Sequence, residues 1–123
     1  MNIIETKKAP AAIGPYSQAI TTGGLVFTSG QIPIDPASGS IAANDIAGQA
    51  RQAIQNLAAV LEAAGSGLDK VVKITCFLTD INDFAVFNEI YEELFPGKPA
   101  RSCVEVSNLP KGALVEIDVI AAR

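Results

Sequence analysis

Lys98-Pro-Ala-Arg-Ser-Cys-Val-Glu-Val-Ser107 and, after a turn, Leu114-Val-Glu-Ile-Asp-Val-Ile-Ala121 decide the fold of this chain. Both segments alternate as β-strands do, because successive side chains of a strand point to opposite faces of a sheet. In the first segment Arg101 and Cys103 share one face, and in the second Glu116 stands opposite an apolar face. The alternation therefore places a guanidinium, a thiol and a carboxylate on rigid strands.

The bulk composition indicates one globular domain spanning residues 1–123. The chain is 49% apolar and 18% charged, and its formal net charge is −4. A chain of this length and composition is large enough to bury a single core. No cluster of Lys and Arg is present, although phosphate-binding surfaces need several cations side by side. Nucleic acid is therefore not expected as the main partner.

The absence of histidine limits the catalytic mechanisms that the chain can use. The sequence holds no histidine, which excludes Ser-His and Cys-His nucleophile pairs, and no cluster with metal-ligand spacing is visible. No segment approaches about 18 continuous apolar residues, so no membrane span is expected. With no export signal visible at the N-terminus and no CxxC spacing, Cys76 and Cys103 are expected to be reduced thiols in a cytoplasmic protein.

Hydrophobic periodicity predicts the order of the elements. Apolar and alternating runs predict strands at 3–6, 18–22, 25–31 and 71–78 and over the two opening segments. Helix-period stripes predict helices over about 45–64 and 81–94. Asn44 is the expected N-cap of the first helix, Gly65 follows its C-terminus, and Asp80 is expected to cap the second helix. Residues 32–40 are predicted to form turns.

The resulting order, β-β-β-α-β-α-β-β, predicts an α+β fold with a mixed six-stranded sheet. Two right-handed crossovers would place both helices on one face of that sheet. The other face is only partly polar, with Phe77 beside Thr75 and Ile120 beside Asp118, and no third layer remains to cover it. We therefore expect a cyclic homo-oligomer whose sheets pack inward. That packing is expected to turn Arg101 and Glu116 towards a partner subunit.

Three side chains on the opening strands are candidates for chemistry. Arg101 can grip a carboxylate through two parallel hydrogen bonds, or it can be an ordinary solvated arginine at a strand end. Glu116 can hold and polarise a water as a general base, or it can be the polar half of an alternating strand. Cys103 shares a face with Arg101, a cation that would raise its reactivity, but without a histidine an interfacial thiol is the better interpretation.

Four residues outside these strands are further candidates. Tyr16 lies in a loop fixed by Pro15, and Ser29 and Gly30 stand at the end of a predicted strand, where a glycine suggests a bulge or a close approach. All three can contribute to a pocket or can simply serve the local turns. Asn88 lies off the apolar stripe of the second helix, where pattern alone leaves its role open.

The sequence resembles the RidA (YjgF) family of enamine/imine deaminases over nearly its whole length. The motifs that carry the resemblance are Gly14-Pro-Tyr-Ser-Gln-Ala, Phe27-Thr-Ser-Gly-Gln-Ile-Pro, Pro99-Ala-Arg-Ser-Cys-Val-Glu-Val, Leu109-Pro-Lys and Val115-Glu-Ile-Asp-Val-Ile-Ala. The resemblance implies a chorismate-mutase-like fold and a homotrimer with clefts between subunits. It also implies hydrolysis of reactive 2-imino acids, such as 2-iminobutanoate and 2-iminopropanoate, to 2-oxo acids and ammonia. Such intermediates escape from pyridoxal-phosphate-dependent dehydratases.

The resemblance also implies a role for each candidate residue. Arg101 would pair with the substrate carboxylate, and Glu116 would position the attacking water together with the backbone of Cys103. The pocket would be lined by Tyr16, Ser29, Gly30 and Asn88. No cofactor is implied.

A second function stays open on the same residues. A non-catalytic or regulatory trimer would use the same cleft to bind small 2-oxo acids without turning them over. Relatives have also been labelled ribonucleases or translation inhibitors, but the acidic balance and the lack of a basic stripe argue against that function here.

Overall fold

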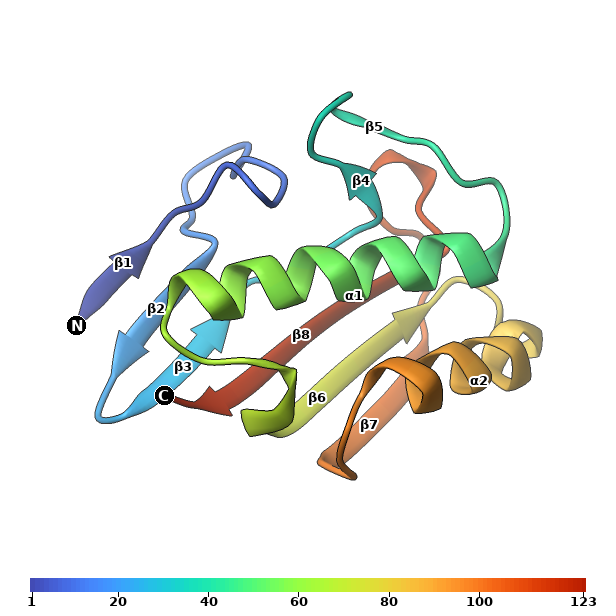
Figure 1. Cartoon of the computed structure of the whole chain (residues 1–123). Helices are drawn as coiled ribbons and strands as arrows, with labels where there is room; N and C mark the ends of the chain where they lie inside the picture. Colours follow the sequence, from blue (N-terminus) through green and yellow to red (C-terminus); the bar gives the residue numbers. More distant parts are fainter.

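The chain is built on one six-stranded sheet in the order β1-β2-β3-β8-β6-β7, and both helices lie on the same face of it (Figure 1). The computed structural model describes residues 1–123. The strands of the large sheet are β1 Asn2–Ile4, β2 Ala19–Thr22, β3 Leu25–Thr28, β6 Val71–Leu78, β7 Ala100–Glu105 and β8 Val115–Ala122. The helices are α1 Ile46–Ala63 and α2 Phe84–Leu94. The predicted α+β architecture with a mixed six-stranded sheet is confirmed.

The strand pairing makes the sheet mixed. Strands β6 and β7 are parallel and are joined across the face by α2, whereas β8 pairs antiparallel with both β3 and β6. The core fills the space between the helices and this sheet. Val115, Ile117 and Val119 of β8 point into it and are at most 2% exposed. No helix is both long enough and apolar enough to cross a membrane.

Helix α1 is one residue shorter than predicted at each end, although Gly65 follows it as expected. Its N-cap is Asp45 rather than Asn44, because the Asp45 carboxylate accepts a hydrogen bond of 2.9 Å from the N–H of Gly48. At the other end Gly65 adopts a φ of 78°, and its N–H donates to the carbonyl of Glu62. A left-handed glycine at this position is a common helix terminator.

Helix α2 is shorter than predicted. Residues Ile81–Asp83 form a 3₁₀ turn, which the Asp80 side chain caps by accepting from the N–H of Asn82 at 2.9 Å. The α-helix proper begins at Phe84. The predicted stripe nevertheless faces the core, with Phe87 fully buried at its centre.

Two short strands were missed within the predicted turns. Strand β4, Ile34–Asp35, pairs with β5, Ser40–Ile41, in a separate two-stranded sheet. Two-residue strands are too short for periodicity to reveal. Buried Asn56 of α1 holds this segment by donating to the carbonyls of Ile32 and Ile34 at 3.1 and 2.8 Å.

Strand β3 ends early because of a bulge. The Thr28 hydroxyl oxygen accepts from the N–H of Val119 at 3.0 Å, in place of a backbone acceptor. Backbone pairing resumes between Gln31 and Ile117, whereas the last regular pair joins Phe27 to Ile120. One extra residue on the β3 side is the signature of a β-bulge. The predicted irregularity at Gly30 is thus confirmed.

The predicted site residues of β7 and β8 lie on opposite faces of the sheet. Arg101 pairs in register with Ile74, and Cys103 with Cys76, so both lie on the helix-covered face. Glu116 lies on the open face, opposite the buried side chains of β8. The expectation that one face of the sheet carries both Arg101 and Glu116 is therefore wrong.

Candidate functional site

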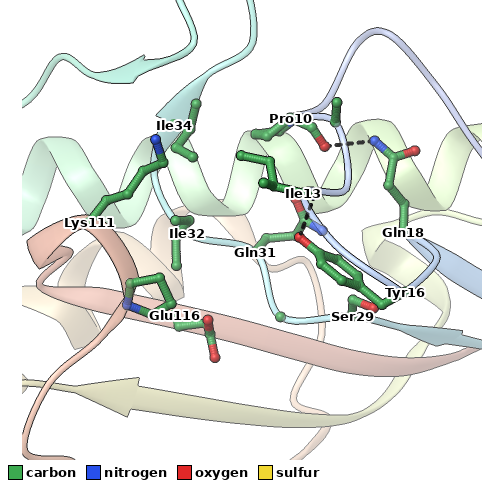
Figure 2. A pocket seen from close by; sticks show the side chains of 13 residues that line it. Pro10, Ile13, Tyr16, Gln18, Ser29, Gln31, Ile32, Ile34, Lys111 and Glu116 are labelled. Atoms are coloured by element: carbon green, nitrogen blue, oxygen red, sulfur yellow. Dashed lines mark hydrogen bonds between the residues drawn. The ribbon is translucent and has the colours of Figure 1, made fainter.

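A pocket of about 430 Å³ opens beside the β3 bulge. Figure 2 shows Tyr16 and Ile13, from the N-terminal loop, on one side and Glu116, from β8, on another. The bulge contributes Ser29, Gly30 and Gln31. Of the seven predicted site residues, the structure therefore brings Tyr16, Ser29, Gly30 and Glu116 together.

Gly30 is the point at which the bulge meets the Glu116 carboxyl group. A Cβ at position 30 would lie 2.7 Å from Cδ of Glu116, which is closer than real side chains approach. The Gly30 N–H donates to no acceptor within the chain, whereas the N–H groups of Ser29 and Gln31 donate to the carbonyls of Gln18 and Ile117. Glycine therefore leaves room for the carboxylate and presents a free donor beside it.

The electrostatics of the open face favour a proton acceptor at Glu116. Burial raises the pKa of the Glu116 carboxyl above its ordinary value, and the neighbouring Asp118 carboxylate raises it further. Burial also raises the pKa of Asp118. A carboxylate that holds its proton more tightly is a stronger base and can more readily accept a proton from a bound water.

Hydrogen bonds of the buried Gln18 side chain and of the half-buried Ser29 side chain fix the loop that carries Tyr16. Gln18 is 3% exposed, donates to the carbonyls of Thr6 and Pro10, and accepts from the N–H of Thr6. The Ser29 hydroxyl donates to the carbonyl of Ser17 at 2.5 Å. The hydroxyl proton of Ser29 is therefore used to anchor the loop and is not free to bind a ligand. Tyr16 remains half-exposed at the pocket wall.

Arg101 and Asn88 lie together at a second surface, against α2. Nη1 of Arg101 donates to Oδ1 of Asn88 at 2.6 Å, and the guanidinium carbon lies 4.6 Å from the centroid of the Tyr91 ring. The only ion pair in the chain joins Arg51 to Glu93, so Arg101 has no carboxylate partner. Its charge is available to an incoming anion.

Cys103 lines neither the pocket beside the bulge nor the second pocket, which contains Arg101 and Asn88. It is half-buried, and burial raises the pKa of its thiol although Arg101 and Cys76 act to lower it. Burial raises the pKa of its neighbour Cys76 to about 12. Neither thiol is thus prepared to act as a thiolate nucleophile. No three His, Cys, Asp or Glu side chains are grouped so that they could hold a metal ion.

The two groups of residues are far apart within one chain. Arg101 pairs with Ile74, which pairs with Val119, three residues from Glu116. Their backbones are therefore separated by about 10 Å along the strands and about 10 Å across two strand spacings, and their side chains lie on opposite faces. A single chain cannot bring both side chains to one small molecule.

Sequence reasoning missed the aromatic contacts of Arg101. Phe84 and Tyr91 both present their rings to its guanidinium, at 5.5 and 4.6 Å. Their spacing from Asn88, four and three residues, would have placed all three on one face of a helix. Lys111 also lines the first pocket, with a left-handed φ of 58°. It belongs to the Leu109-Pro-Lys motif, but the sequence assigned it no role at the site.

Comparisons with known proteins agree with this fold and these motifs. The family model described as Endoribonuclease L-PSP matches residues 6–123. A RutC family protein of Pyrococcus horikoshii is 55% identical over 122 residues, which cover 98% of this chain and 97% of that protein.

Two further relatives carry more informative names. A Salmonella typhimurium protein named 2-iminobutanoate/2-iminopropanoate deaminase is 51% identical over 124 residues, covering 98% of this chain and 96% of its own. The crystal structure of the YjgF gene product of E. coli superposes with a TM-score of 0.95 at 47% identity, covering 100% of this chain and 99% of that one. The chain therefore belongs to the RidA (YjgF) family.

Proposed function

We propose that this protein hydrolyses short 2-imino acids, such as 2-iminobutanoate and 2-iminopropanoate, to 2-oxo acids and ammonia. The reaction would limit damage by intermediates that escape from pyridoxal-phosphate-dependent dehydratases. Support comes from the relative named as such a deaminase at 51% identity. The structural observation that carries the proposal is Arg101, a fixed guanidinium without a carboxylate partner.

In this proposal Arg101 anchors the substrate and Glu116 activates water. The guanidinium binds the substrate carboxylate through its free N–H groups. Glu116 takes a proton from water as the oxygen attacks the imine carbon, and it passes that proton to nitrogen to give a carbinolamine. The same carboxylate then transfers the hydroxyl proton to nitrogen as the C=O bond forms and the C–N bond breaks, so that ammonia leaves. Cys103 lies two residues beyond Arg101 on β7 and would bring its backbone to the same cleft. An imine is already electrophilic, so orientation and one base can provide much of the acceleration.

The separation of Arg101 from Glu116 leads us to propose that the cleft forms between copies, in a homotrimer. A cyclic assembly with head-to-tail contacts can join the Arg101 surface of one copy to the Glu116 pocket of the next. The open face of the sheet also carries apolar side chains that a lone chain leaves in water. Phe27 is 39% exposed and Val104 is 45% exposed. Burying such groups between copies would be favourable.

Release of ketobutyrate by threonine dehydratase tests the proposal. We expect the purified protein to accelerate that release, and we expect Arg101→Ala to remove the acceleration because it removes the substrate anchor. No acceleration by the intact protein would contradict the proposal. Binding of 2-oxobutanoate without acceleration would instead indicate a non-catalytic carboxylate-binding protein.

Gly30→Ala is expected to lower turnover by about 100-fold, since a misplacement of about 1 Å in a catalytic group has that scale of effect. The added methyl group would displace Cδ of Glu116, which lies 2.7 Å from its position. Turnover and thermal unfolding are measured together.

Gly39→Ala is the control, because a methyl group there meets nothing within 4 Å. It should cost about 1 kcal/mol through the left-handed φ of 76° yet retain turnover. Equal turnover in both variants would contradict the proposed role of Gly30.

A further inference from the structure

The Arg101 guanidinium is held by three side chains that α2 presents on one face. Phe84, Asn88 and Tyr91 are spaced four and three residues apart, so they lie one above the other along the helix. Asn88 accepts the hydrogen bond from Nη1 at 2.6 Å, and the two aromatic rings lie 5.5 and 4.6 Å from the guanidinium carbon. None of the three carries a charge, so they attract the cation without neutralising it.

The ring of Tyr91 is itself held in place by the ring of Phe95. Its ring stacks on Phe95 with a centroid distance of 4.6 Å and an interplanar angle of 21°, and Phe95 is only 4% exposed. The ring of Tyr91 makes this contact and the contact with Arg101, whereas its hydroxyl takes part in neither. The guanidinium therefore rests on an aromatic pair that is anchored in the core.

We propose that Tyr91 is a positioning residue that fixes the plane of the Arg101 guanidinium for a bound carboxylate. Asn88 engages one N–H of a group that has five in a rigid fork. The aromatic contact restricts rotation of the fork, so the remaining N–H groups are oriented before the ligand arrives. A preorganised arginine loses less freedom on binding than a free one. The inference rests on the proposed function, because it takes the anion to be the carboxylate of an imino or oxo acid.

Calorimetric titration with 2-oxobutanoate, the stable product of the proposed reaction, measures this role. Tyr91→Leu and Tyr91→Met both remove the aromatic face, and Met approximately preserves the length of the side chain. We expect each to raise the Kd about tenfold, the scale of a partly desolvated cation–π contact. Tyr91→Phe keeps the ring and should bind within about twofold of wild type. Unchanged affinity in Tyr91→Leu and Tyr91→Met, or a loss in Tyr91→Phe as large as in Tyr91→Leu, would overturn the proposal.

A second measurement does not depend on any activity. Phenylglyoxal modifies accessible arginines, and peptide mass spectrometry reports the rate at Arg101. We expect faster modification of Arg101 in Tyr91→Leu and Tyr91→Met than in wild type, with Tyr91→Phe and the rate at Arg51 unchanged. Equal rates at Arg101 in all four proteins would overturn the positioning role. Failure of the wild type to accelerate ketobutyrate release would reject the proposed function alone, since the arginine rates still decide the role of Tyr91.

Discussion

Chains carrying Arg101→Ala and chains carrying Glu116→Ala are each expected to be inactive, yet a refolded equal mixture should recover about one quarter of wild-type activity. In the proposed trimer each cleft takes Arg101 from one copy and Glu116 from another. With random assembly, half of the positions supply an intact arginine and half supply an intact glutamate. About one cleft in four therefore receives both.

The measurement is ketobutyrate release by the mixture, compared with each variant refolded alone. A mixture of Arg101→Ala chains with chains that carry both substitutions is the control, because none of its clefts can contain Arg101. It should remain inactive. Absence of recovery in the first mixture, with trimers present by light scattering, would contradict a cleft shared between copies.

Glu116→Gln is expected to lower kcat by about 10²–10⁴-fold, the usual contribution of a general base. Glutamine preserves the shape of the side chain but cannot accept the proton of the attacking water. In the wild type, activity should fall as the pH drops through the pKa of Glu116. Because burial and Asp118 raise that pKa, the fall should occur above the ordinary range of a carboxyl group.

Asp118→Asn is the matched control on the same strand and face. It should retain turnover and move the acid limb to lower pH, since it removes the negative charge that raises the pKa of Glu116. Glu116→Gln should not reduce the melting temperature at neutral pH. A carboxyl group whose pKa is raised by folding favours the folded state when protonated and opposes it once ionised. Full turnover in Glu116→Gln would show that water is activated elsewhere.

Periodicity predicted the parts of the fold that have long, one-sided patterns. Strand β6 was predicted over its observed bounds, and the face of β8 that packs on the helices was clear because Val115, Ile117 and Val119 are all apolar. Strand β7 offered no such contrast. Both of its faces mix polar and apolar residues, so alternation showed that Arg101 and Cys103 share a face without showing which face the helices cover.

Six of the seven residues expected at the site line one of two pockets, but the arrangement of those residues was not predictable. Tyr16, Ser29, Gly30 and Glu116 meet in one pocket, and Asn88 meets Arg101 in another. The residues that meet in the first pocket come from segments up to about a hundred positions apart in the sequence. Their proximity depends on the strand order of the sheet and on the bulge at which the Thr28 hydroxyl accepts from the N–H of Val119. Local pattern predicted an irregularity at Gly30, but it could reveal neither the sheet order nor which side chains meet at the bulge.

The alternation along β8 has a consequence for how this protein can evolve. One set of its side chains is sealed under the helices, and the intervening set, which includes Glu116, Asp118 and Ile120, points out of the core. Substitutions at outward positions other than Glu116, the proposed base, leave the packing of the inward set intact, so new substrate preferences can be selected there without first acquiring compensating stabilising mutations. A directed-evolution library confined to these outward positions should therefore yield a high fraction of folded chains.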